Sequence, residues 1–194
     1  KGHAVESFWD WVASWATMGG CPSDLGPEFN AAEFALPPLE TTSHVVGVDL
    51  VADRGAMLFR VPEMSATSVH QERRRTAVAR AAKVAELVTA EPTEPWIIWT
   101  ETDYEADALV AALPDAMNLR GSESLEAKER MLESFADGSR LILISKPKLA
   151  GFGLNWQHCA RVAFVSATFS FESYYQAIRR CWRFGQTRPV QVHM

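Results

Sequence analysis

The sequence is poor in the features that mark secreted, membrane-spanning and zinc-binding proteins. It contains only three cysteines in 194 residues, without a CxxC pair or a histidine at zinc-ligand spacing. No apolar run approaches the roughly 18 residues that a membrane-spanning helix needs, and the first residues do not resemble a signal peptide. We therefore expect buried free thiols, no metal site, no membrane partner and a cytoplasmic location.

Two phosphate-binding motifs are also missing. The chain contains no GxxxxGK[ST] sequence, so it has no P-loop of its own. Its GxG element, Gly151-Phe152-Gly153, allows a close approach of the backbone to a ligand. A third glycine does not follow, and this argues against a dinucleotide-binding GxGxxG motif. The sequence therefore lacks the main cradle for a nucleotide phosphate.

Acidic residues are almost absent from the last third of the chain. Between residues 138 and 194 the only acid is Glu172, against eight bases. The bases are Arg140, Lys146, Lys148, Arg161, Arg179, Arg180, Arg183 and Arg188. This third carries a net charge of +7. Because the whole chain carries −5, the first 137 residues carry −12. Such a basic block predicts a localised anion site, for phosphate that is either free or part of nucleic acid.

From residue 95 onward, apolar runs typical of buried strands alternate with helical patterns. Strands are predicted at residues 96–100, 116–119, 140–145, 160–165 and 190–193. Before them we expect an irregular lead-in at residues 1–43, which contains an aromatic helix. A strand at 44–50 and a long helix at 65–90 should follow. Thr102 and Glu105 form a capping-box pattern at the start of the helix after the first of these strands. The alternation predicts an α/β fold with a mostly parallel sheet and helices on both faces, with ligands beyond the carboxyl ends of the strands.

A helical wheel over residues 171–184 places aromatic and aliphatic side chains on one arc. The opposite arc carries Gln176, Arg179, Arg180 and Arg183, with no acid among them. Like charges three or four residues apart destabilise a helix mildly, so this arrangement favours contact with an anion. A solvated basic face is the alternative interpretation.

Two stretches of the chain resemble motifs V and VI of superfamily 2 helicases. They are Gly151-x-Gly153-x-Asn155 and Gln176-x3-Arg180-x2-Arg183-x-Gly185-Gln186. The closest resemblance is to Snf2-like (SWI/SNF-type) DNA translocases, of the compact phage or bacterial type. The run WIIWTE at 96–101 resembles motif IV, and the similarity covers about residues 35–194.

This resemblance implies that residues 44–194 form the second RecA-like lobe of a two-lobed motor. The lobe would be a three-layer αβα domain without its own P-loop, and residues 1–43 would be the lead-in between lobes. An N-terminal RecA-like lobe of the same parent chain, preceding Lys1, would hold most of the ATP and Mg²⁺. No cofactor is expected to bind tightly to this fragment alone.

The resemblance also assigns roles to individual residues. Arg183 and Arg180 would be catalytic arginine fingers, a device worth on the order of 10³–10⁵ in rate in P-loop enzymes. The nucleotide-binding residues would be Gln176, Gly151, Gly153 and Asn155. The residues in contact with the nucleic-acid backbone, expected to be double-stranded DNA, would be Gly121, Ser122, Lys146 and Lys148.

Some positions depart from the helicase pattern, and two other functions stay open. Arg179 stands where relatives often have an acid, so its role is open, and Lys128 stands where an arginine is usual. We interpret Trp156 and Trp182 as packing residues rather than base-stacking residues.

One alternative function is an ATP-independent module that binds nucleic acid or a partner. Another is a free-standing Rossmann-like enzyme that binds NAD or a methyl donor.

Overall fold

The computed structural model describes residues 5–17, 19, 24–26, 32, 35–47, 66–150, 154–166 and 170–194. The chain divides into two compact units, Lys1–Leu36 and Pro37–Met194. The first unit contains the predicted aromatic helix, α1 (Glu6–Ala13). Within that unit the rings of Trp11 and Trp15 lie 5.3 Å apart, and both side chains are largely exposed.

The second unit is built on a six-stranded sheet in which every pair of neighbouring strands is parallel. The strands are β1 (Leu39–Thr42), β2 (Trp96–Trp99), β3 (Met117–Leu119), β4 (Ile142–Ser145), β5 (Arg161–Phe164) and β6 (Val190–His193). Their order across the sheet is β1-β6-β5-β2-β4-β3. The helices are α2 (Ala66–Arg75), α3 (Ala77–Ala90), α4 (Asp103–Ala112), α5 (Leu125–Ala136) and α6 (Phe171–Ile178).

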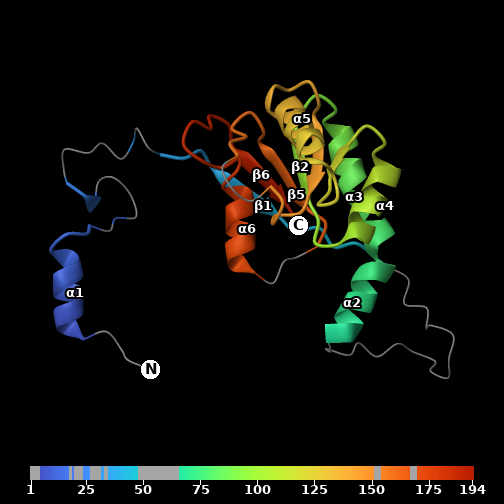
Figure 1. The fold of residues 1–194 in the computed structure, drawn as a ribbon. Coiled ribbons are helices and arrows are strands. Elements are labelled where there is room, and N and C mark those ends of the chain that lie inside the picture. The colour runs from blue at the N-terminus through green and yellow to red at the C-terminus, as the bar shows by residue number, and fades with distance from the viewer. Residues whose placement is uncertain are drawn as a thin grey trace. The chain divides into compact units, whose positions relative to one another are not determined.

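Helices cover both faces of this sheet, because the central strands are apolar on both sides. On β2, Ile97 and Trp99 belong to a core shared with α5 and α6, whereas Trp96 and Ile98 belong to a core shared with α3 and α4. Figure 1 shows these layers, with α6 on one side of the sheet and α3 and α4 on the other. The predicted α/β, three-layer RecA-like fold is confirmed.

The first strand of the sheet lies earlier than predicted. Residues 44–47 are irregular, residues 48–50 of the predicted strand lie outside the described residues, and the strand is β1. Because β1 is an edge strand with three exposed residues, its backbone pairing with β6 defines it rather than an apolar pattern. The sheet therefore begins before residue 44, where we expected the lobe to start. Its assignment as the second lobe of a motor stays a prediction.

The single long helix predicted at 65–90 is two helices, α2 and α3, separated at Thr76. The Thr76 hydroxyl donates a hydrogen bond of 2.7 Å to the Glu72 carbonyl oxygen, a back-bonding that often bends helices. Within the described ranges, no helix has the length and apolarity required to cross a bilayer.

A buried ion pair joins α3 to α4. The predicted capping box is present, and the Glu105 carboxylate accepts a hydrogen bond of 3.2 Å from the Thr102 backbone N–H. The same carboxylate is fully buried and lies 2.8 Å from the Arg80 guanidinium, which also donates to the carbonyl oxygen of Val165 at 2.7 Å. Arg80 thereby connects α3, α4 and the end of β5.

Candidate functional site

Helix α6 ends at Ile178, six residues before the predicted end, and Arg179 is its C-cap. Residues 179–188, here called the arginine turn, then lead to β6. The predicted two-faced helix over 171–184 is therefore wrong. Phe171, expected on the buried arc, is 77% exposed, whereas Arg180, expected on the polar arc, is only 7% exposed. The helical wheel fails for Arg180 because the chain leaves the helix before this residue, whereas Phe171 lies at the first position of α6 and is still exposed.

Arg180 is a buried cation without a partner in the part of the chain that the structure describes. Among the described residues, its buried Nε atom has no hydrogen-bond acceptor and its guanidinium forms no ion pair. Burial lowers the pKa of Arg180, and the positive charge of Arg183 lowers this pKa further. An uncompensated charge of this kind is costly and would be stabilised by an anion.

Arg183 lies beside Asn155, and the two were predicted separately as catalytic and nucleotide-binding residues. The Arg183 guanidinium donates a hydrogen bond to Asn155 Oδ1, although the two residues are 28 positions apart in the chain. The Nε of Arg183 is buried and has no acceptor among the described residues. The fold thus brings together the end of the motif V pattern and the arginines of the motif VI pattern.

Arg179 and the tryptophans have packing roles. The Arg179 guanidinium lies 5.5 Å from the ring centre of Trp182 and 5.9 Å from that of Tyr175, which are cation–π distances. The indole N–H of Trp182 donates a hydrogen bond of 2.8 Å to the Pro37 carbonyl oxygen. Trp156 is 1% exposed and packs edge-on against Phe135. Both tryptophans therefore pack, as predicted.

The arginine turn lies at the amino edge of the sheet, where the strands begin. Trp156 N–H donates to the Arg180 carbonyl oxygen at 2.9 Å, and Trp156 lies in the segment that leads into β5. We expected ligands beyond the carboxyl ends of the strands, but α6 runs back along the sheet and delivers the turn to the opposite edge (Figure 1).

The predicted nucleic-acid residues lie at the carboxyl edge, where the strands end. Lys146 follows β4 and forms a 2.8 Å ion pair with Asp103 at the start of α4, while Lys148 is exposed. Gly121 and Ser122 follow β3 and are exposed, and Lys128 Nζ donates to the Gly121 carbonyl oxygen at 2.8 Å. These four residues and the cluster of Arg180, Arg183 and Asn155 thus occupy opposite edges of one sheet.

Residues 79–185, more than half of the chain, match the sequence model of the family described as "helicase conserved C-terminal domain". The chain belongs to this family.

Two solved structures share the fold of this helicase C-terminal domain. The C-terminal part of the Fun30 ATPase domain is 22% identical with a TM-score of 0.53, and the match covers 59% of this chain and 40% of that chain. The C-terminal domain of the DEAD-box protein Dbp5 is 19% identical with a TM-score of 0.51, and the match covers 59% of this chain and 69% of that chain. No curated protein sequence matches the chain. The predicted helicase resemblance is confirmed at the level of this family and fold.

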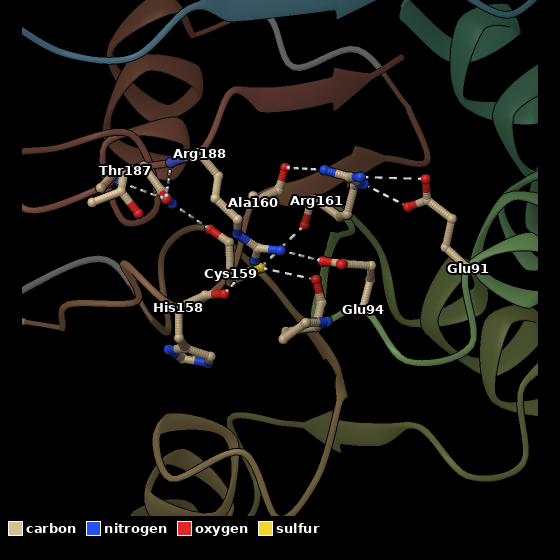
Figure 2. A network of polar contacts seen from close by, with 10 residues as sticks. Glu91, Glu94, His158, Cys159, Ala160, Arg161, Thr187 and Arg188 are labelled. Atoms are coloured by element: carbon tan, nitrogen blue, oxygen red, sulfur yellow. Dashed lines mark hydrogen bonds and ion pairs between the residues drawn. The ribbon is translucent and has the colours of Figure 1, made fainter.

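Ion pairs at the amino edge remove two arginines of the helicase domain from the candidate site. Figure 2 shows the guanidinium of Arg161 pointing to Glu91 and that of Arg188 pointing to Glu94. The hydrogen bond to Glu91 raises the pKa of Arg161, and Arg188 also donates to the His158 carbonyl oxygen at 2.7 Å. With Lys146 paired as well, five bases of the block have no carboxylate partner among the described residues. They are Arg140, Lys148, Arg179, Arg180 and Arg183.

The remaining predicted site residues are less informative. Gly151 and Gly153 lie outside the described residues, and Gln176 is exposed on α6. In the described ranges no group of three histidine, cysteine or acidic side chains could hold a metal ion.

One residue of the site was missed by sequence reasoning. The Gln157 side chain donates a hydrogen bond of 2.9 Å to the Phe184 carbonyl oxygen, inside the arginine turn. A single glutamine in an irregular segment carries no sequence signal for such a contact.

Proposed function

We propose that this helicase C-terminal domain is the second RecA-like lobe of an ATP-dependent, Snf2-like DNA translocase of the compact phage or bacterial type. Its partner is an N-terminal RecA-like lobe of the same parent chain, which holds most of the ATP and Mg²⁺. The observation that carries the proposal is the pair Arg180 and Arg183. They lie in one turn beside Asn155, and no described carboxylate neutralises either of them.

The side chains of the arginine turn suit the oxygens of a phosphate. When bound, ATP supplies the γ-phosphoryl group that is transferred to water. A guanidinium has five N–H donors, so Arg183 keeps donors for phosphoryl oxygens while one N–H holds Asn155. Arg180 adds a second positive charge in a largely dehydrated position, where an electrostatic interaction is stronger than in water.

The position of Arg180 is held independently of any ligand. Its carbonyl oxygen accepts a hydrogen bond from Trp156, a core residue, so the backbone on which the guanidinium stands is anchored. A donor that is already in place needs little reorganisation when charge develops on a phosphate. We assign Arg183 and Arg180 as the catalytic arginines, and Gln176, Gly151, Gly153 and Asn155 as nucleotide-binding residues.

The carboxyl edge is the proposed contact for double-stranded DNA. Lys148 is exposed and has no carboxylate partner among the described residues, and Gly121 and Ser122 lie on exposed backbone after β3. Lys146 exchanges its contact with Asp103 for one with a phosphate when DNA binds. Such contacts carry little sequence information, as a translocase requires. The protein would work in the cytoplasm of a bacterial or phage-infected cell.

The test is DNA-stimulated ATPase activity of the full-length protein that carries this domain, with Arg183→Ala beside Arg140→Gln. Arg183→Ala should lower kcat by about 10³-fold, in the range for an arginine finger. Arg140 belongs to the same basic block, but it is exposed and donates to the Asp115 carbonyl oxygen, so Arg140→Gln should leave kcat within about twofold.

The result also separates the proposal from an ATP-independent binding module. Unchanged turnover in Arg183→Ala would refute the arginine-finger assignment. Salt-dependent DNA binding by the 194-residue chain, together with unchanged turnover in that variant, would favour the binding module instead.

A further inference from the structure

We infer that Gln157 is a positioning residue that holds the arginine turn in the shape that presents Arg183. This inference rests on the proposed function, because it matters for catalysis only if Arg183 acts on the nucleotide. Its structural basis is a row of hydrogen bonds between two segments that are distant in the sequence, residues 155–159 and residues 180–188.

Each of the five residues from 155 to 159 makes one hydrogen bond with the arginine turn. Three of these bonds involve the backbone of residues 156, 158 and 159, and two involve side chains of residues 155 and 157. The pairs are Asn155 with Arg183, Trp156 with Arg180 at 2.9 Å, Gln157 with Phe184 at 2.9 Å, His158 with Arg188 at 2.7 Å, and Cys159 with Gln186 at 3.0 Å.

A buried glutamine anchors the inner part of the turn. The Gln186 amide donates to the carbonyl oxygens of Cys159 and Cys181, at 3.0 and 3.3 Å, and its Oε1 accepts from the backbone N–H groups of Thr187 and Arg188. Gln186 is 6% exposed, so this anchor is part of the core. Removing it would disturb the fold as well as the turn.

Gln157 holds the outer part of the turn, and it is only half-buried. Its amide N–H donates to the carbonyl oxygen of Phe184, the residue directly after Arg183. Gly185 has a positive φ of 93°, and a Cβ at Gly185 would lie 3.1 Å from the Gln157 amide nitrogen. The glutamine amide therefore fits a space that exists because residue 185 has no side chain.

The consequence concerns where the Arg183 guanidinium points. The backbone N–H of Gln186 donates to the Arg183 carbonyl oxygen at 3.0 Å, so residues 183–186 form one tight turn whose outer peptide is held by Gln157. If that peptide rotates, Arg183 moves away from Asn155. A displacement of about 1 Å in a catalytic group can cost about 10²-fold in rate, so a surface glutamine here can control activity without touching the nucleotide.

The decisive experiment is a double-mutant cycle on the full-length protein, with the variants Gln157→Met, Arg183→Ala and both together. Methionine keeps the length and volume of the side chain but cannot donate to Phe184. Gln157→Met alone should lower kcat at least tenfold and leave the KM for ATP within about twofold. In the Arg183→Ala background it should cause no further loss, because two residues that act through one group are not additive. Gln71→Met, at an exposed position on α2, is the matched control and should have no effect.

A second measurement reports on the turn itself. Amide hydrogen exchange of peptides covering residues 179–188 should be at least tenfold faster in Gln157→Met, while peptides covering β2 keep their protection. If Gln157→Met does not fold, Gly185→Ala replaces it, because the new Cβ would push the same amide away and strain a positive φ. The same kinetic pattern is expected for that variant.

The outcomes separate the two proposals. Loss of activity in Arg183→Ala with normal kcat in Gln157→Met would overturn the role of Gln157 alone. An equal loss from Gln157→Met in both backgrounds, or unchanged exchange of residues 179–188, would also overturn it. Full activity in Arg183→Ala would overturn the proposed function and the role of Gln157 with it.

Discussion

Arg183 donates a hydrogen bond to the side-chain oxygen of Asn155, a residue 28 positions earlier in the chain. This contact joins the segment between β4 and β5 to the turn between α6 and β6. It is the point at which two motif patterns, recognised separately in the sequence, become one cluster. Because Arg180 stands in the same turn without a partner in the described chain, the cluster carries two positive charges and no acid.

The unpaired charge of Arg180 should make the protein less stable than an apolar variant at that position. We expect Arg180→Met to raise the free energy of unfolding by about 1 kcal/mol or more, because it removes a buried cation that has no partner among the described residues and keeps a similar volume. The same change should abolish ATP turnover. Chemical denaturation and ATPase assays on the same protein check both effects.

Arg161→Met is the comparison for this prediction. Arg161 has the same charge but is paired with Glu91, so its replacement should destabilise the domain. A loss of stability in Arg180→Met as large as that in Arg161→Met would show that Arg180 has a compensating partner.

Lowering the pH should reduce the free energy of unfolding of the domain, because the Glu105 carboxylate becomes protonated. Burial alone would raise the pKa of Glu105, but hydrogen bonds from Arg80 and from the Glu101 N–H outweigh burial and hold it below the ordinary value of 4.5. A carboxyl with a lowered folded-state pKa contributes stability above its unfolded pKa and loses it as the pH falls toward the folded value. Glu105→Gln should therefore cost roughly 2–4 kcal/mol at pH 7, and the difference from the wild type should shrink below about pH 4.5.

Urea unfolding at pH 7, 5 and 4 measures this difference. Glu86→Gln serves as the control, since Glu86 forms an exposed pair with Lys83 and such pairs contribute little. A difference between Glu105→Gln and wild type that stays constant over this pH range would contradict the prediction.

The two lysines at the carboxyl edge should differ in their effect on DNA binding. Lys148 is exposed, whereas Lys146 already has Asp103 as a partner at 2.8 Å. Lys148→Ala should reduce the slope of log K against log salt concentration by about 0.9, the value for one lost phosphate contact. Lys146→Ala should change the slope less, because binding must first break an existing ion pair. Fluorescence anisotropy with a DNA duplex over a salt series measures both slopes, and a larger effect of Lys146→Ala would reverse this assignment.

The thiols of Cys159 and Cys181 should be inert in the folded protein. Both are 0% exposed, and the hydrogen bond with Cys159, together with burial, raises the pKa of Cys181 well above its ordinary value. In a Cys21→Ser background, a thiol reagent at pH 8 should label neither cysteine until denaturant unfolds the chain, and should then label both. Rapid labelling under native conditions would show that the segment carrying Gln186 opens easily.

The parts of the fold that were predicted correctly are those with a strong local signal. Strands β2, β4 and β5 lie in short apolar runs, β6 alternates apolar and polar residues, and the helix after β2 begins at a capping box, so each element follows from a few neighbouring residues. The errors have two causes. Strand β1 is selected by pairing with β6, which is distant in the sequence, whereas Thr76 divides a helix through a local hydrogen bond to Glu72 that composition alone does not predict.

The candidate site shows the same division. The spacing of Arg180, Arg183 and Asn155 was enough to indicate the helicase family, because it resembles motifs V and VI of that family. The spacing could not show that α6 stops at Ile178, that Arg180 is buried, or that Gln157 reaches the arginine turn. Those facts depend on contacts of the arginine turn with Trp156 and Cys159, which come from another part of the chain.

The sequence by itself therefore determined the α/β class, the basic block and the residues that make the chain a helicase C-terminal domain, because local patterning and residue chemistry carry that information. Only the tertiary structure decided which of the basic residues remain uncompensated. Glu91, Glu94 and Asp103 neutralise Arg161, Arg188 and Lys146 across 70, 94 and 43 positions of sequence, and no local pattern predicts such pairs. Once those pairs form, three of the five bases that have no carboxylate partner among the described residues, Arg179, Arg180 and Arg183, lie in the arginine turn.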